Sequence, residues 1–155
     1  MTDFVFACMT SSGKGAKQAL LLARSIRIFA GDLAHKAIWV LVPQDERGFV
    51  TQMEADFKSL NVRLVPFALS EEVRNFPFAA KTFAAAKAET LAEKVATFLV
   101  WMDRDSIVLQ EPDALRLPQG KVLGYRPVDH TLIGSPIDSP VDDFWSLVYR
   151  LCDVP

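Results

Sequence analysis

Several features are scarce in the 155-residue sequence, and each scarcity argues against a class of protein. The two cysteines, Cys8 and Cys152, match no metal-binding or redox spacing, which favours buried or free thiols and a reducing, cytoplasmic location. The net charge is only −2 and the basic residues are scattered, which argues against nucleic acid as a partner. No window approaches the roughly 18 unbroken apolar residues of a membrane span, and the first apolar run is too short for a signal peptide.

Glycine-rich phosphate-binding motifs are also missing. The stretch "SSGKGA", residues 11–16, follows the first apolar run and contains two glycines and a lysine. It fits neither G-x-x-x-x-G-K-[ST] nor G-x-G-x-x-G, so a triphosphate cradle is not predicted. A polar loop that opens a helix still offers free N–H groups to an anion.

The sequence does contain a regular alternation of short apolar runs and helical stretches. Apolar runs with the pattern of buried strands lie at 4–9, 37–43, 62–67 and 97–102. Helices are predicted from about 16 to Gly31, at 46–60 and at 79–95, an irregular loop at 70–78, a further strand at 121–127 and a last helix at 140–152. This order predicts a Rossmann-like three-layer α/β/α fold with a mostly parallel sheet, and the length fits a single domain over residues 1–155.

The most distinctive polar residues are Asp103 and Asp105, in "FLVWMDRDSIVLQEP". Parallel sheets bind ligands beyond the carboxyl ends of their strands, and this pair follows directly after the fourth apolar run. In an extended segment both carboxylates point to one side, where they can reach one divalent cation or one ribose while Arg104 turns away. The ordinary alternative is that one aspartate caps a turn and the other is merely exposed. The apolar segment Ile107–Leu109 after the pair favours a functional role, because it fixes the acids between two rigid elements.

The string "ATFLVWMDRDSIVLQEP", with the preceding helix that carries Lys81 and Glu89, resembles the nucleotide-sugar-binding half of GT-A glycosyltransferases. The resemblance extends from about Phe4 to Tyr125. It implies a nucleotide-diphospho-sugar donor, an acceptor of unidentified chemistry, and Mn²⁺ or Mg²⁺ as cofactor. Asp103 would contact the ribose or the metal, and Asp105 would ligate the metal that bridges the two phosphates.

The same resemblance implies roles for several other residues. Lys81 lies where family members often carry a basic residue near the diphosphate, although a solvated lysine at a helix start is the alternative. The loop residues Thr10, Ser11 and Ser12 would border the base and ribose. His130 is the sole histidine after the motif, and it either completes the metal site or faces solvent from a loop.

The chain is short for a GT-A enzyme, which has a further segment that binds the acceptor. We therefore expect a shortened or truncated chain that lacks a complete acceptor-binding segment, and we identify no catalytic residue. A catalytically incomplete nucleotide-sugar-binding module is one alternative. Another is a phosphatase of the haloacid-dehalogenase type, with Asp103 as nucleophile and Asp105 as general acid, although little chain follows for that family's later motifs. The sequence leaves the oligomeric state open and is compatible with an oligomer.

Overall fold

The structure is a computed structural model that describes residues 4–74, 76, 79–118, 120–121, 140–141, 143, 146–147 and 150. The chain divides into two compact units, Met1–Arg116 and Leu117–Pro155. Most of the strand predicted at 121–127 and most of the helix predicted at 140–152 lie outside the described residues. The single domain predicted over 1–155 stays a prediction.

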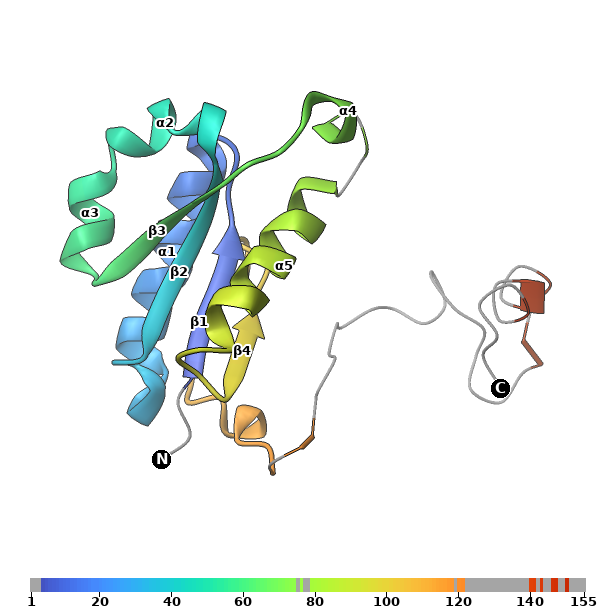
Figure 1. The fold of residues 1–155 in the computed structure, drawn as a ribbon. Coiled ribbons are helices and arrows are strands. Elements are labelled where there is room, and N and C mark those ends of the chain that lie inside the picture. The colour runs from blue at the N-terminus through green and yellow to red at the C-terminus, as the bar shows by residue number, and fades with distance from the viewer. Residues whose placement is uncertain are drawn as a thin grey trace. The chain divides into compact units, whose positions relative to one another are not determined.

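The first unit contains a parallel sheet of four strands in the order β3-β2-β1-β4 (Figure 1). The strands are β1 (Phe4–Met9), β2 (Ala37–Pro43), β3 (Val62–Phe67) and β4 (Phe98–Trp101). The first three have the predicted bounds, and β4 is one residue shorter than predicted at each end. β1 pairs with β2 on one side and with β4 on the other.

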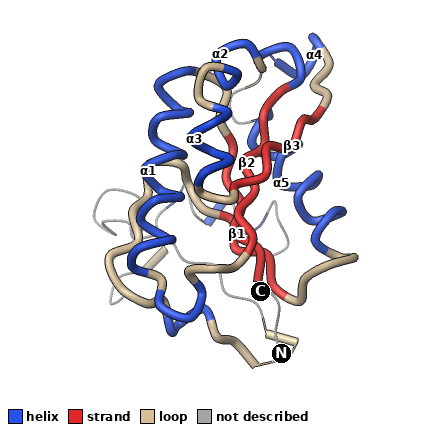
Figure 2. The backbone as a smooth tube through the Cα atoms, turned by 90° about the vertical axis from the view of Figure 1, so that its left-hand side faces the viewer, coloured by secondary structure: helices blue, strands red, loops and turns tan. Residues whose placement is uncertain are grey.

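Helices cover both faces of this sheet, which confirms the predicted three-layer α/β/α fold. They are α1 (Gly13–Phe29), α2 (Gly48–Thr51), α3 (Glu54–Ser59), α4 (Glu71–Arg74) and α5 (Ala79–Ala92), with short 3₁₀ turns η1 (Gly31–Leu33), η2 (Gln44–Glu46) and η3 (Asp113–Leu115). Figure 2 shows α1 and α3 on one side of the strands and α5 on the other.

The side chains of β1 alternate between the two layers. Phe6 and Cys8 belong to the core that α1 and α3 cover, whereas Ala7 and Met9 belong to the core beneath α5. α5 contributes Ala84, Ala88 and Ala92, whose four-residue spacing places three small side chains on one buried face of the helix. The helix can therefore pack closely on the sheet.

Two predicted segments differ from the structure. The helix predicted at 46–60 is divided into α2 and α3, with a break at Gln52 and Met53. The hydroxyl of Thr51 donates to the carbonyl of Arg47 four residues earlier, a contact that often bends helices. The loop predicted at 70–78 contains the single helical turn of α4, which begins with Glu71 and Glu72, two acids that suit a helix start.

After β4 the chain turns back and crosses α1. Val108 is buried in the core on the α1 side, and its backbone N–H donates to the hydroxyl of Ser25 at 3.0 Å. Ser25 lies on α1, is 4 % exposed, and donates in turn to the carbonyl of Leu22 at 2.7 Å. The buried serine thus fastens the segment that follows Asp103 and Asp105 to α1.

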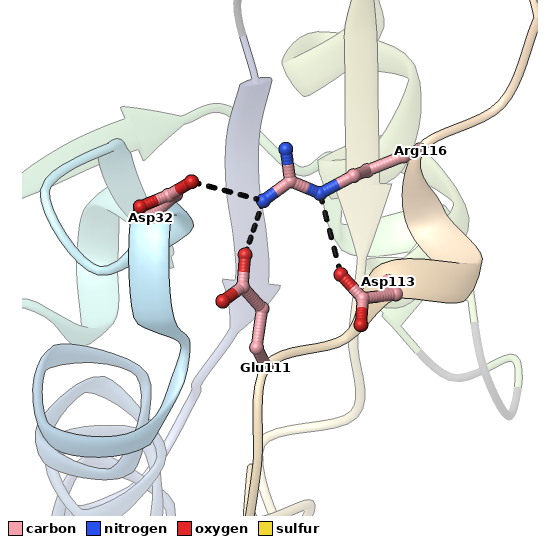
Figure 3. Close-up of polar contacts among 4 residues, drawn as sticks. All are labelled: Asp32, Glu111, Asp113 and Arg116. Atoms are coloured by element: carbon pink, nitrogen blue, oxygen red, sulfur yellow. Dashed lines mark hydrogen bonds and ion pairs between the residues drawn. The ribbon is translucent and has the colours of Figure 1, made fainter.

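An ion-pair cluster holds the far end of this returning segment (Figure 3). The guanidinium of Arg116 contacts the carboxylates of Asp32, Glu111 and Asp113, and its hydrogen bond to Glu111 raises the pKa of Arg116. Gly31 has a φ of +54°, and a Cβ there would collide with the Glu111 carboxylate. The cluster lies beside η1, which precedes β2, so the returning segment spans from the carboxyl to the amino end of the sheet.

Ser25→Ala is expected to lower the free energy of unfolding by about 1–3 kcal/mol, because the buried N–H of Val108 loses its acceptor. Urea denaturation measures this difference. Ser59→Ala is the matched control, since the exposed Ser59 hydroxyl donates to the carbonyl of Asp56 and its removal should cost less than about 0.5 kcal/mol. Equal losses in the two variants would contradict the role assigned to Ser25.

Candidate functional site

Asp103, Arg104 and Asp105 lie in a tight turn at the carboxyl edge of the sheet. The N–H of Met102 still donates to the carbonyl of Ala7 on β1, and the N–H of Ser106 then donates to the carbonyl of Asp103 at 3.0 Å. The extended geometry expected for this segment is therefore wrong. The chain turns here because Val108, three residues past Asp105, must reach the core over α1.

The two carboxylates of this turn face solvent. The side chain of Asp103 is 53 % exposed, and Asp105 is exposed as well. Asp105 has no hydrogen-bond or ion-pair partner among the residues that the structure describes. The turn thus presents one paired and one unpaired carboxylate at the edge where parallel sheets bind ligands.

Lys81 reaches this turn from the first turn of α5. Its ammonium group forms an ion pair and hydrogen bond with the Asp103 carboxylate, although 22 positions separate the two residues in the sequence. The structure therefore brings together two of the residues that the sequence singled out. Lys81 is 44 % exposed, so the pair is accessible to a ligand.

The loop after β1 carries Thr10, Ser11 and Ser12. The Thr10 side chain is fully buried, and its hydroxyl donates to the carbonyl of Ser12 at 3.3 Å. Ser12 is the N-cap of α1, because its hydroxyl accepts the N–H of Gly15 at 3.1 Å. Ser11 is half-buried between them. Thr10 and Ser12 thus shape the loop and the start of α1, and both hydroxyls already have a partner there.

Two buried side-chain atoms of the described residues have no hydrogen-bond partner, and both belong to this edge of the sheet. They are Nε of Arg104, which follows β4, and Oε2 of Glu46, which follows β2. Buried polar atoms are nearly always paired in native proteins, so unpaired ones need an explanation. The sequence analysis did not predict that either atom would be buried without a partner. The one sequence signal was that each residue follows a strand.

The side chain of Arg104 lies against the first turn of α1. A Cβ added to Gly15 would be 2.9 Å from Nε of Arg104 and 2.5 Å from Oγ1 of Thr10. Burial raises the pKa of the Cys8 thiol to about 12, and the nearby charge of Arg104 opposes that rise. A positive charge thus lies beneath the turn whose carboxylates face outward.

The donor atoms at this turn suit a hard divalent cation. Mg²⁺ and Mn²⁺ prefer oxygen ligands, and Mg²⁺ is commonly held by one or two carboxylates together with substrate phosphates and water. Within the described residues no group of three or more histidine, cysteine, aspartate or glutamate side chains is gathered for a metal. His130, predicted as a further ligand, lies outside the described residues.

Comparison with known proteins assigns a family. Among the residues that the structure describes, no helix is long and apolar enough to cross a membrane. No curated protein matches the sequence. Residues 6–155 match the Rhodobacterales glycosyltransferase domain, a match that extends over nearly the whole chain. The chain therefore belongs to the Rhodobacterales glycosyltransferase domain family.

Proposed function

We propose that this chain binds a nucleotide-diphospho-sugar through Mn²⁺ or Mg²⁺ held by Asp103 and Asp105, and transfers the sugar to an acceptor. The observation that carries the proposal is the turn after β4, where both carboxylates face solvent and Lys81 contacts one of them. A glycosyltransferase needs a sugar donor and an acceptor, so membership of this family supports the proposal that the chain binds a donor.

The protein supplies only part of the coordination that such a cation requires. Asp103 and Asp105 contribute carboxylate oxygens, and the diphosphate and water would contribute the others, with His130 a proposed further ligand. When bound, the cation acts as a Lewis acid that stabilises the negative charge of the departing nucleoside diphosphate. Because both carboxylates are exposed, little desolvation opposes binding.

Lys81 would change partners when the donor binds. Its ion pair with Asp103 is about half exposed at both ends, and pairs of that kind contribute only ~0–1 kcal/mol. Lys81 would release Asp103 if that carboxylate held a divalent cation, and its ammonium group would then be available to the negatively charged diphosphate. The weak pair thus keeps Lys81 near the phosphates without holding it in place.

The start of α1 provides an electropositive border for the donor. Its first turn contains no acidic residue, so nothing there offsets the positive end of the helix dipole. The loop hydroxyls of Thr10 and Ser12 already have partners, so contacts from this loop to the base and ribose would come chiefly from Ser11 and from backbone groups.

The family match favours glycosyl transfer over the phosphatase alternative. The incomplete binding module is the second candidate, because every described candidate residue lies within the first unit, Met1–Arg116. Both candidates require the same donor site. They differ in whether the bound sugar is transferred to an acceptor.

A thermal-shift titration with UDP-, GDP- and CDP-linked sugars, with and without Mn²⁺, tests the donor site. We expect stabilisation by one donor class only when Mn²⁺ is present, amounting to about 2.7 kcal/mol at one hundred times the dissociation constant. Asp105→Asn should remove the metal-dependent part, whereas Asp56→Asn, at an exposed aspartate of α3, should retain it. If no nucleotide stabilised the wild type in a metal-dependent way, the proposal would be wrong.

The donor class found in that titration then decides between the two candidates. Incubation of the wild type with the donor, Mn²⁺ and a panel of acceptors should release nucleoside diphosphate and give a glycosylated product. Binding without acceptor-dependent release would favour the incomplete module over the transferase.

Replacing Lys81 should change metal and donor binding in opposite directions. Lys81→Met should raise the affinity for Mn²⁺ alone about two- to fivefold, because the competing ammonium is lost from Asp103. The same variant should lower the affinity for donor plus Mn²⁺ about tenfold, through loss of a charged hydrogen bond worth ~1.5 kcal/mol. Isothermal titration calorimetry measures both constants.

Lys87→Met is the control for this pair of measurements, since Lys87 lies on the same helix and is exposed. It should alter neither constant. A Lys81→Met variant that bound Mn²⁺ alone more weakly than the wild type would contradict the exchange of partners.

A further inference from the structure

The contact between Arg104 and Gly15 joins the turn after β4 to the first turn of α1. A Cβ at position 15 would lie 2.9 Å from Nε and 3.1 Å from Cδ of Arg104, so the arginine stem occupies the space that the missing side chain leaves. Gly15 is itself buried. The two residues are 89 positions apart in the sequence, so this contact is a tertiary one.

In this position Arg104 has a buried N–H donor without a hydrogen-bond acceptor. Its Nε is buried without an acceptor, and no hydrogen bond or ion pair joins the guanidinium to any of the described residues. A solvent-facing arginine at an exposed turn would avoid that cost, because water would satisfy all of its N–H groups. The inward position is therefore set by packing against α1 and not by a polar partner.

The inward arginine has a direct consequence for the residues on either side. Arg104 occupies the second position of a four-residue turn that is closed by the Ser106 N–H and the Asp103 carbonyl. With this position fixed on Gly15, the neighbouring side chains of Asp103 and Asp105 are left to face solvent. The turn is then held at three points, by β1 before it, by Gly15 beneath it and by Ser25 after it.

We propose that Arg104 is a positioning residue, which orients the carboxylates of Asp103 and Asp105 toward the metal by packing its stem on Gly15. The inference rests on the proposed function, because it concerns the same donor site. Residues that orient metal ligands typically change metal affinity about 10- to 100-fold when replaced. The stem, and not the charge, performs this role.

A role through charge and a role through packing predict opposite changes in Mn²⁺ affinity when Arg104 is replaced. If Arg104 acted only through its charge, Arg104→Ala would strengthen Mn²⁺ binding, because a positive charge near the cation would be removed. If its stem positions the turn, Arg104→Ala should weaken Mn²⁺ binding in the presence of nucleoside diphosphate about tenfold, because the atoms that pack on Gly15 are lost. The paramagnetic resonance signal of Mn²⁺ measures the free and bound metal directly.

Gly15→Ala tests the same contact from the other side. The added methyl group must displace Oγ1 of Thr10 and the stem of Arg104, so the metal affinity should fall as it does in Arg104→Ala. In the double variant the two losses should not add, because either change alone already breaks the contact. Gly48→Ala is the control, since no atom lies within 4 Å of the added Cβ there, and it should leave Mn²⁺ binding unchanged.

Amide hydrogen exchange at Ser106 reports on the turn without any ligand. The Ser106 N–H closes the turn, so its exchange should become about tenfold faster in Arg104→Ala and in Gly15→Ala, but not in Gly48→Ala. Arg104→Met removes the charge but retains a stem that reaches Gly15, so it should leave Ser106 exchange unchanged, and Gly15→Ala is the second variant should Arg104→Ala fail to fold.

The outcomes separate this inference from the proposed function. Absence of metal and donor binding in the wild type would refute the proposed function, and with it the positioning of metal ligands. Normal wild-type binding together with unchanged Ser106 exchange, or with stronger Mn²⁺ binding, in Arg104→Ala would refute the role of Arg104 alone. Weaker binding, faster exchange and non-additive losses would establish it.

Discussion

Complete burial of β1 is the constraint on which the other elements depend. All six of its residues are buried, so the strand needs a neighbour on each edge and a helix over each face. β2 and β4 are the neighbours on its two edges, and α1 and α5 cover its two faces. Both edges and both faces of β1 are therefore covered. At its carboxyl end, Thr10 and Ser12 lead the chain directly into α1. The candidate site is built around that exit.

Much of the fold could be predicted from the sequence because its signals are local. The apolar runs that form β1, β2 and β3 are bounded by polar or turn-forming residues, and their observed ends match the predicted ones. The fourth run led correctly to the carboxyl edge and placed Asp103 there. The sequence analysis placed Lys81 and Asp103 near the same ligand but did not predict the ion pair between them.

The features that could not be predicted depend on contacts between distant parts of the chain. Whether residues 103–106 extend or turn is decided by the buried site that Val108 occupies over α1. The packing of Arg104 on Gly15 depends on how closely β4 approaches the start of α1, which no periodicity records. Glu46 follows a strand whose end was predicted, yet burial of its carboxylate oxygen depends on the surrounding fold.

The path of the chain after residues 103–106 determines how long a segment must be to return to the carboxyl edge of the sheet. The Arg116 cluster, with Asp32 beside η1, places the end of the first unit at the amino end of the strands, opposite the carboxyl edge. Six residues of β1 span roughly 20 Å at about 3.3 Å per residue. A segment that follows Arg116 would therefore need at least about six extended residues to return along the sheet to its carboxyl edge.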